Sequence, residues 1–168
     1  MPRLDIIRKK IFTYTDADYS RMLTIWKFQE KKIVFTNGCF DILHLGHIDY
    51  LSKAKDLGDL LIIGLNTDLS VSKIKGKNRP IQDEISRAFV LASLGFVDVV
   101  VFFGETTPLN LIETTQPDIL VKGADYKPED IVGYDIVNGK GGEICTIEFL
   151  EGYSTTSIEK KILGSTAL

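Results

Sequence analysis

One stretch decides the fold of this chain: Phe35-Thr36-Asn37-Gly38-Cys39-Phe40-Asp41-Ile42-Leu43-His44-Leu45-Gly46-His47. The apolar run 31–35 that leads into it is typical of a buried parallel strand, and 47–57 is predicted as a helix that ends at Gly58. A phosphate held at the turn between them would meet free backbone N–H groups and the positive end of the helix dipole, where each such interaction favours an anion by roughly 0.3–1 kcal/mol. His44 and His47, the only two histidines of the chain, would stand beside that anion. The stretch therefore indicates phosphoryl-transfer chemistry.

The segments that follow alternate between strand-like and helix-like patterns. Apolar runs predict further strands at 59–66, 97–103, 117–121 and 143–149, and apolar residues at helical spacing predict helices at 81–94, 107–115 and 158–163. An interval of about thirty residues between the first two strands fits a right-handed crossover between parallel strands. The expected fold class is therefore α/β, a Rossmann-like parallel sheet of about five strands with helices on both faces. Ligands of such sheets bind beyond the carboxyl ends of the strands, where the glycine-histidine turn lies.

The length and composition fit one domain preceded by an arm. With 168 residues, 44% of them hydrophobic, the chain can bury one core, and we assign 31–168 to a single domain that contains the glycine-histidine turn. Residues 1–30 are assigned to an N-terminal helical arm, because apolar side chains recur at helical spacing from Leu4 to Glu30, with Thr15 or Asp16 as candidate N-caps. Nothing in the arm suggests chemistry, so we expect it to pack on the core or against a second subunit.

Charge and cysteine content argue against several classes of protein. Twenty Lys and Arg against 23 Asp and Glu give a net charge of −3, which is too balanced for a protein that grips long nucleic acid. Cys39 and Cys145 lie in apolar surroundings and fit reduced thiols better than a disulfide framework. The first residues lack the apolar segment of a signal peptide, and no apolar run approaches membrane-spanning length. We therefore expect a cytoplasmic protein with no membrane partner.

Two further segments could hold anions. The segment 72–80 carries four cations, Lys73, Lys75, Lys77 and Arg79, and it follows the carboxyl end of a predicted strand. Charge runs are usually solvated surface connections, but this origin places the cations near the expected phosphate site. The hydroxyl-rich turn 153–157 leads into the last predicted helix, so its side chains and N–H groups form a second ready-made anion site.

The pattern Gly38-x-Phe40-Asp41-x-x-His44-x-Gly46-His47 resembles the signature of the cytidylyltransferase-like nucleotidyltransferases, which join a nucleoside monophosphate unit to a phosphorylated small molecule. Residues 32–163 resemble more narrowly the bacterial heptose-1-phosphate adenylyltransferases, which make ADP-heptose for lipopolysaccharide. Four stretches carry this narrower resemblance: 36–41, Lys75-Gly76-x-x-Arg79-Pro80, Val121-Lys122-Gly123-x-Asp125-Tyr126-Lys127-Pro128 and Ser154-Thr155-Thr156-Ser157. The resemblance implies a nucleotidyltransferase-type fold and transfer of AMP from ATP to a heptose 1-phosphate, with Mg²⁺ accompanying ATP and pyrophosphate released.

The resemblance also implies roles for individual residues. His44, His47 and Lys75 are the implied catalytic residues, with the imidazoles at the α- and β-phosphates. The implied nucleotide-binding residues are Thr36, Asn37, Gly38, Cys39, Phe40, His44, Gly46, His47, Lys122, Gly123, Asp125, Tyr153, Ser154, Thr155 and Thr156. Candidates for the sugar phosphate are Lys73, Lys75, Lys77 and Arg79, and spacing leaves open which of them reaches it. Asp41 is interpreted as structural support that accepts hydrogen bonds from backbone N–H groups, and no metal site made by the protein is implied.

The sequence leaves open which nucleotide the protein uses, and it allows other classes of function. The cytidylyl relatives carry an arginine before the hydroxyl-rich turn, whereas 148–151 holds no basic residue, which favours ATP. Glycerol-3-phosphate cytidylyltransferase and pantetheine-phosphate adenylyltransferase-like activities are the alternative enzymes. Cys39, His44, His47 and Cys145 include the ligand types of a zinc site, so a metal-binding regulatory domain is the alternative that is not an enzyme. A redox Rossmann module is disfavoured, because no Gly-x-Gly-x-x-Gly follows the first strand. We expect a homo-oligomer, a dimer or higher.

Overall fold

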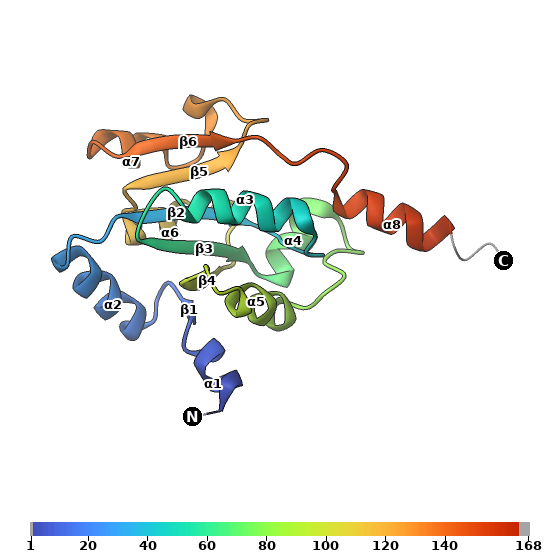
Figure 1. The fold of residues 1–168 in the computed structure, drawn as a ribbon, viewed down its shortest axis with the longest axis horizontal. Helices are drawn as coiled ribbons and strands as arrows, with labels where there is room; N and C mark the ends of the chain where they lie inside the picture. The colour runs from blue at the N-terminus through green and yellow to red at the C-terminus, as the bar shows by residue number, and fades with distance from the viewer. Residues whose placement is uncertain (1, 165–168) are drawn as a thin grey trace.

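Six parallel strands form one sheet in the computed structural model, which describes residues 2–164 (Figure 1). The strands are β1 (Ile11–Thr13), β2 (Ile33–Gly38), β3 (Leu60–Asn66), β4 (Val99–Phe103), β5 (Ile119–Gly123) and β6 (Glu143–Ile147). Their order across the sheet is β1-β4-β3-β2-β5-β6. The predicted Rossmann-like architecture is confirmed, with one strand more than expected. The order reverses at β2, so the carboxyl ends of β2 and β5 flank the topological switch point, where open α/β sheets bind ligands.

Helices cover both faces of the sheet. On one face lie α1 (Arg3–Arg8), α3 (Leu45–Lys55) and α5 (Glu84–Ser93), and on the other lie α2 (Ala17–Phe28), α6 (Leu109–Thr115) and α7 (Tyr134–Gly139). The remaining elements are α4 (Asp68–Lys75), the 3₁₀ turn η1 (Pro128–Asp130) and α8 (Thr155–Gly164). No helix within residues 2–164 has the length and apolar character that crossing a membrane requires.

Alternate strand residues enter the two layers of the core. On β3, Leu61 and Ile63 pack towards α3 and α5, whereas Ile62 packs towards α6. Because successive side chains of a strand point to opposite faces, a strand covered on both sides reads as the continuous apolar run seen in the sequence. The strands are thereby packed on both faces, and the loops at their carboxyl ends start from the buried core.

The arm differs from the continuous helix expected over 4–30. Ile11–Thr13 leaves the helix and pairs with β4, opposite Val100, Val101 and Phe102, as an edge strand of the sheet. Ile, Phe and Thr favour strands, which is the local reason for the break. The carboxylate of Asp16, the N-cap residue of α2, accepts a hydrogen bond from the Thr13 N–H at 2.7 Å and closes the following turn. The arm therefore packs on the chain's own core.

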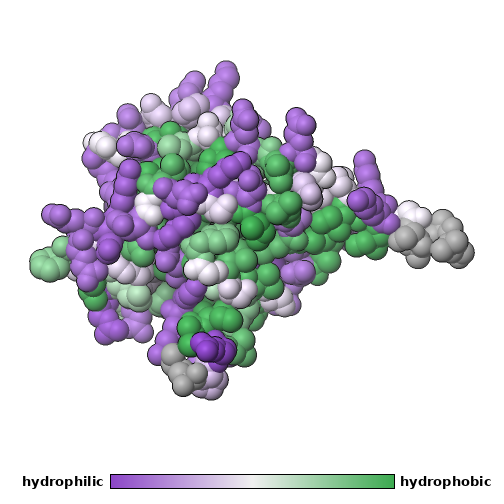
Figure 2. Space-filling view, viewed as in Figure 1, coloured by the Kyte–Doolittle hydropathy of each residue, from purple (hydrophilic) through white to green (hydrophobic). Residues whose placement is uncertain are grey.

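Two further boundaries differ from those predicted: the basic segment is helical in its first part, and the last helix, predicted at 158–163, is α8 at Thr155–Gly164. The basic segment was expected as a loop from Ser72 to Pro80, but its first part is helical, because α4 continues to Lys75 before Gly76 ends it with a positive φ of 98°. The last helix has no buried residue and extends away from the body of the molecule (Figure 1). Figure 2 shows hydrophobic surface continuing from the body onto this helix, and Leu45 and Leu163 are among the exposed apolar side chains.

Candidate active site

A cavity of about 490 Å³ lies where the strands end at the switch point. Residues at the ends of β2, β3 and β5 form its base, and side chains from α3 and α4 form part of its wall. Nearly all the chemistry-bearing groups of the sequence signature are thereby gathered within one concavity. A ligand bound here would lie across the carboxyl edge of the sheet, as the fold class predicts.

The signature turn is held in a preset shape. Phe40 has a left-handed backbone with φ of 45°, which a bulky side chain rarely adopts, and its ring is buried. The ring lies over Gly38, where an added Cβ would come 3.0 Å from Phe40 Cε2. The same ring meets the His47 imidazole edge-on, with centroids 5.3 Å apart. Gly38 and Phe40 therefore fix the position of the histidine that follows.

The two histidines form a stacked pair. His44 is the N-cap residue of α3 and His47 lies in its first turn, and their rings stack with centroids 3.9 Å apart and planes 23° from parallel. Burial, reinforced by the nearby His44 and Lys75, lowers the pKa of His47 to about 4, and burial also lowers the pKa of His44. The Nδ1 atoms of both rings are shielded from solvent and have no hydrogen-bond partner within residues 2–164. The lowered pKa values favour the neutral rings, and a neutral imidazole can donate a hydrogen bond through one nitrogen without carrying charge.

Two lysines bring positive charge to the cavity. Lys75, at the end of α4, and Lys122, on β5, both line it. Burial lowers the pKa of Lys122 to about 8, although Asp125 and Cys39 oppose this shift. The Lys122 ammonium donates to the backbone oxygen of Asn37 at 3.4 Å. An anionic ligand would stabilise the charged form of Lys122, since an opposite charge nearby raises the pKa of a lysine.

Asp41 ties the basic segment to the signature turn. Its buried carboxylate accepts hydrogen bonds from the N–H groups of Ile81 and Gln82, at 2.8 and 3.0 Å, and from Arg79 Nη1 at 2.9 Å. Burial alone would raise the pKa of Asp41, but these donors outweigh it and hold the pKa below its ordinary value. The other end of Arg79 pairs with Glu159 of α8. The expected supporting role of Asp41 is observed, although the N–H groups belong to a distant segment.

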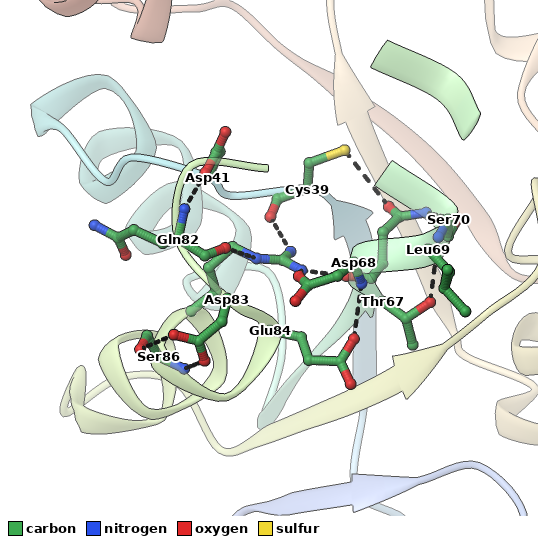
Figure 3. Close-up of polar contacts among 12 residues, drawn as sticks. Cys39, Asp41, Thr67, Asp68, Leu69, Ser70, Gln82, Asp83, Glu84 and Ser86 are labelled. Atoms are coloured by element: carbon green, nitrogen blue, oxygen red, sulfur yellow. Dashed lines mark hydrogen bonds and ion pairs between the residues drawn. The ribbon is translucent and has the colours of Figure 1, made fainter. Parts of the chain in front are cut away.

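Arg87 lies beneath the site and was not anticipated from the sequence. Its side chain is fully buried on α5 and donates to the backbone oxygens of Cys39, Asn66 and Gln82, at 2.6, 2.9 and 3.0 Å. It also pairs with Asp68 at 2.7 Å. Figure 3 shows Cys39, Gln82 and Asp68 converging on this guanidinium from three separate segments. One side chain thus joins the ends of β2 and β3 to the start of α5.

The structure brings together about half of the residues predicted for the site. The cavity is lined by Asn37, Gly38, Cys39, Phe40, His47, Lys75, Lys122, Gly123, Asp125 and Thr155. His44 does not itself line the cavity but stacks on His47, which does. Thr36 is fully buried and shares a hydrogen bond with Tyr50 at 2.8 Å, so its side chain supports the site from within the core. Lys73 and Lys77 are exposed and do not line the cavity.

The hydroxyl-rich turn contributes one side chain to the cavity. Thr155 lines it, whereas the Ser154 hydroxyl accepts from the Ser157 N–H at 3.1 Å and caps α8. Tyr153 and Thr156 are exposed and lie outside the lining. Gly46 allows the turn to approach α3, because a Cβ there would come 3.2 Å from Tyr153 Cβ. Ser154 is thus the cap of the last helix, and Thr155 beside it is the residue of this turn that lines the cavity.

Gly123 has a packing reason as well as a place in the lining. A Cβ at this position would come 2.2 Å from the ring of Phe149, which itself lines the cavity. Asp41, which was predicted as structural support, also lines the cavity. The sequence did not predict Phe149 or ten other lining residues: Tyr50, Asn66, Ile74, Thr106, Thr107, Pro108, Tyr126, Asp130, Ile131 and Val132. Several of them follow the carboxyl ends of β3, β4 and β5, which was the signal available in the sequence.

The cysteines do not form a metal site with the histidines. Both are free thiols, and burial raises the pKa of Cys39 and of Cys145. Within residues 2–164, no three His, Cys, Asp or Glu side chains are arranged to hold a metal ion. The zinc alternative therefore has no geometric support in this part of the chain.

The family follows from these motifs and from direct comparison. Residues 35–161 match the family model described as cytidylyltransferase-like. The chain belongs to the cytidylyltransferase-like family. The matched range begins at the signature turn and extends into α8, so it contains every wall of the cavity. The chain is accordingly a nucleotidyltransferase, as the resemblance implied.

Individual relatives agree with this assignment. The bifunctional protein HldE of Geobacter metallireducens is 56% identical over 167 residues, which are 95% of this chain and 34% of that protein. The bifunctional protein HldE of Campylobacter concisus is 59% identical over 133 residues, 79% of this chain and 27% of that one. The chain thus spans about a third of the length of these relatives.

Solved structures support the fold. A lipopolysaccharide core biosynthesis protein from Thermoplasma volcanium is 31% identical, with a TM-score of 0.58 over 74% of this chain and 99% of the other. A pantoate-beta-alanine ligase from Francisella tularensis, solved with beta-gamma ATP and beta-alanine, has a TM-score of 0.55 at 18% identity, covering 90% of this chain and 76% of that one. The second likeness concerns the fold alone.

Proposed function

We propose that this chain transfers AMP from ATP to a heptose 1-phosphate, forming ADP-heptose and pyrophosphate. The observation that carries the proposal is the stacked His44–His47 pair, of which His47 lines the same cavity as Lys75 and Lys122. The narrower choice of acceptor is supported by the four sequence stretches that resemble heptose-1-phosphate adenylyltransferases. It is also supported by relatives named HldE and by a neighbour described as a lipopolysaccharide core biosynthesis protein.

The reaction needs positioning rather than an enzyme nucleophile. A phosphate oxygen of the acceptor attacks the α-phosphorus of ATP and forms a new P–O bond, while the bond from the α-phosphorus to the bridging oxygen breaks and pyrophosphate leaves. Negative charge shifts towards the leaving pyrophosphate. Preorganised donors aimed at that charge stabilise the transition state. His47 and His44 would donate to the α- and β-phosphate oxygens, and Lys75 would balance the charge of the polyphosphate.

Mg²⁺ would enter with ATP, because it usually keeps several waters and binds substrate phosphates rather than a cage made only by the protein. The carboxylate of Asp125 lines the cavity and is an oxygen ligand of the type that Mg²⁺ takes. This cation supplies charge neutralisation at the phosphates. The side chains of the protein remain responsible for orienting the two substrates.

The test is a pyrophosphate-release assay with ATP, CTP, GTP and UTP, each paired with heptose 1-phosphate and with glycerol 3-phosphate. We expect the highest kcat/KM for ATP with heptose 1-phosphate, in line with the absence of a basic residue from 148–151. A preference for CTP would contradict the adenylyl assignment while leaving the family intact. A preference for glycerol 3-phosphate would contradict the sugar acceptor.

A further inference from the structure

We propose that the half of the cavity on the α6 side of the sheet recognises the hydroxyl groups of a sugar phosphate, through Asn37, Thr106, Thr107 and Asp130. These residues were not assigned to the acceptor by the sequence, and the inference rests on the proposed function. The cavity lies across the carboxyl edge of the sheet, so its lining residues belong to both faces of the sheet.

Strand alternation divides the lining into two halves. On β2, Val34 packs with the α3 layer and Thr36 bonds to Tyr50 of α3, whereas Phe35 packs with the α6 layer. Asn37 follows this alternation and lies on the α6 side, because a Cβ on Gly64 would meet Phe35, Asn37 and Leu111 together, at 2.9, 3.1 and 3.1 Å. The histidine pair of α3 therefore faces one half of the cavity and Asn37 faces the other.

Lys122 belongs to the same half as Asn37. On β5, Val121 packs in the α3 layer and Leu120 in the α6 layer, so the next side chain, Lys122, points to the α6 side. Its ammonium reaches the Asn37 backbone oxygen at 3.4 Å. A cation thus lies beside this half, where it can attract an anionic acceptor towards the histidines.

Thr106 and Thr107 directly precede Pro108, the N-cap residue of α6, and Asp130 directly precedes Ile131, which packs in the α6 layer, so these residues belong to the same half. This half has hydrogen-bonding groups that make no bond within the described part of the chain. Asn37 Oδ1 is shielded from solvent and has no partner within residues 2–164. In the same described range, the side chains of Thr106, Thr107 and Asp130 form no hydrogen bond, and all three line the cavity and are exposed. Two hydroxyls, a carboxylate and an amide therefore converge on one space without partners of their own.

This set of groups matches a polyhydroxylated ligand. A sugar offers several hydroxyls, each able to donate and accept, and apolar C–H faces between them. Pro108, the N-cap residue of α6, and Ile131, which packs in the α6 layer, supply apolar surface in the same half of the cavity. A short acceptor with few hydroxyls would leave the shielded Asn37 Oδ1 without a partner, and a site that bonds a substrate hydroxyl at a buried group discriminates against analogues that lack it.

The experiment uses Thr107→Val and Asp130→Asn, with Thr114→Val and Glu129→Gln as matched controls that lie outside the cavity lining. Steady-state kinetics give the KM of heptose 1-phosphate, and calorimetry gives the Kd of ATP without an acceptor present. We expect the acceptor KM to rise roughly 3- to 10-fold for Thr107→Val and about 10-fold or more for Asp130→Asn, since the latter weakens charge-assisted bonds. The Kd of ATP in all four variants, and the acceptor KM of the two controls, should stay within about twofold of wild type, because none of these quantities loses a hydrogen bond, whose loss would cost about 3- to 10-fold.

The outcomes separate the inference from the proposed function. If wild type turns over heptose 1-phosphate but the two variants weaken ATP binding and leave the acceptor KM unchanged, the subsite is wrong and the function stands. If neither the acceptor KM nor the Kd of ATP changes in Thr107→Val and Asp130→Asn, the proposed subsite is also wrong. If wild type turns over no sugar phosphate, the proposed function fails and the inference fails with it. Thermal midpoints of all four variants, measured alongside, confirm that each is folded.

Discussion

Arg87 donates to the backbone oxygen of Cys39 at 2.6 Å, although the two residues lie 48 positions apart in the chain. Cys39 belongs to the signature turn and Arg87 to a helix on one face of the sheet. The contact therefore transmits the position of α5 directly to the turn that carries Phe40 and the histidines. The buried guanidinium satisfies three backbone carbonyl groups that would otherwise need water or another donor.

We predict that Arg87→Gln destabilises the fold by about 3–5 kcal/mol, because it leaves buried carbonyl groups unpaired and removes the partner of Asp68. Urea unfolding at pH 7 measures this change. The control is Arg21→Gln, whose ion pair with Asp18 is exposed, with side-chain accessibilities of 72% and 71%, and which should change stability by less than about 0.5 kcal/mol. A loss below 1 kcal/mol for the Arg87 variant would show that water replaces the guanidinium without difficulty.

Much of the fold was predictable because it depends on local signals. Continuous apolar runs marked β2 to β6, and the positions of Gly58 and Pro108 marked helix ends. The strand β1 was missed because Ile11–Thr13 is only three residues long and lies between two helices whose spacing runs through it. Its identity depends on pairing with β4, almost ninety residues later in the chain, and a local pattern does not contain that information.

The site was predictable to a smaller extent, for a related reason. The signature turn carries its own conformation, so Gly38, Phe40 and His47 were found directly. Arg79 was expected at the sugar phosphate, and the structure instead pairs it with Asp41 and Glu159. Arg87 had one sequence signal, because it is spaced four residues from Leu91 on the apolar face of its helix. A charge on a buried face indicates a buried partner, but the partner lies far away in sequence.

The arm is expected to affect binding of the acceptor through Tyr14. The Tyr14 hydroxyl donates to the Glu105 carboxylate and, ahead of other causes, lowers the pKa of Glu105. Ser70 Oγ donates to the backbone oxygen of Glu105 at 2.7 Å, and the next residues, Thr106 and Thr107, line the cavity. Tyr14→Phe should therefore raise the acceptor KM about 3-fold, the scale of one lost hydrogen bond, with the Kd of ATP unchanged. Thr15→Val is the neighbouring control, and an equal effect in both variants would assign the change to the arm as a whole.

We predict that the arm also lies in or beside a dimer interface. Ile25 and Phe28, three residues apart on α2, remain exposed after the arm has packed on its own sheet, and Phe28 is 89% exposed. Contiguous exposed apolar surface commonly marks an interface. Light scattering at micromolar concentration should give the mass of a dimer, and Phe28→Ser should shift the protein towards monomer. If wild type is a monomer, the predicted interface is wrong, and the arm packs only on the core of its own chain, as in the structure.

Acid should destabilise the protein through His47. Its pKa is about 4 in the folded chain against the ordinary 6.5, so the unfolded chain binds the extra proton between these values. The stabilisation is fully present above about pH 6.5 and is lost as the pH falls towards 4. Between pH 7 and pH 5, wild type should lose about 1–2 kcal/mol more stability than His47→Gln, measured by urea unfolding. Parallel losses in the two proteins would mean that His47 titrates normally.

Replacing His47 should impair the chemical step more than it impairs substrate binding. Charge at the α-phosphorus is redistributed only during transfer, so a donor aimed at it stabilises the transition state more than the bound substrates. His47→Ala should lower kcat by about 10²–10³-fold, the usual scale for one preorganised donor, with a smaller change in KM. Lys53→Ala is the control, because this lysine lies on the outer side of α3 and pairs with Asp49. An unchanged kcat with a large rise in KM would make His47 a binding group only, and a collapsed thermal midpoint would make its role structural, since Phe40 packs against its ring.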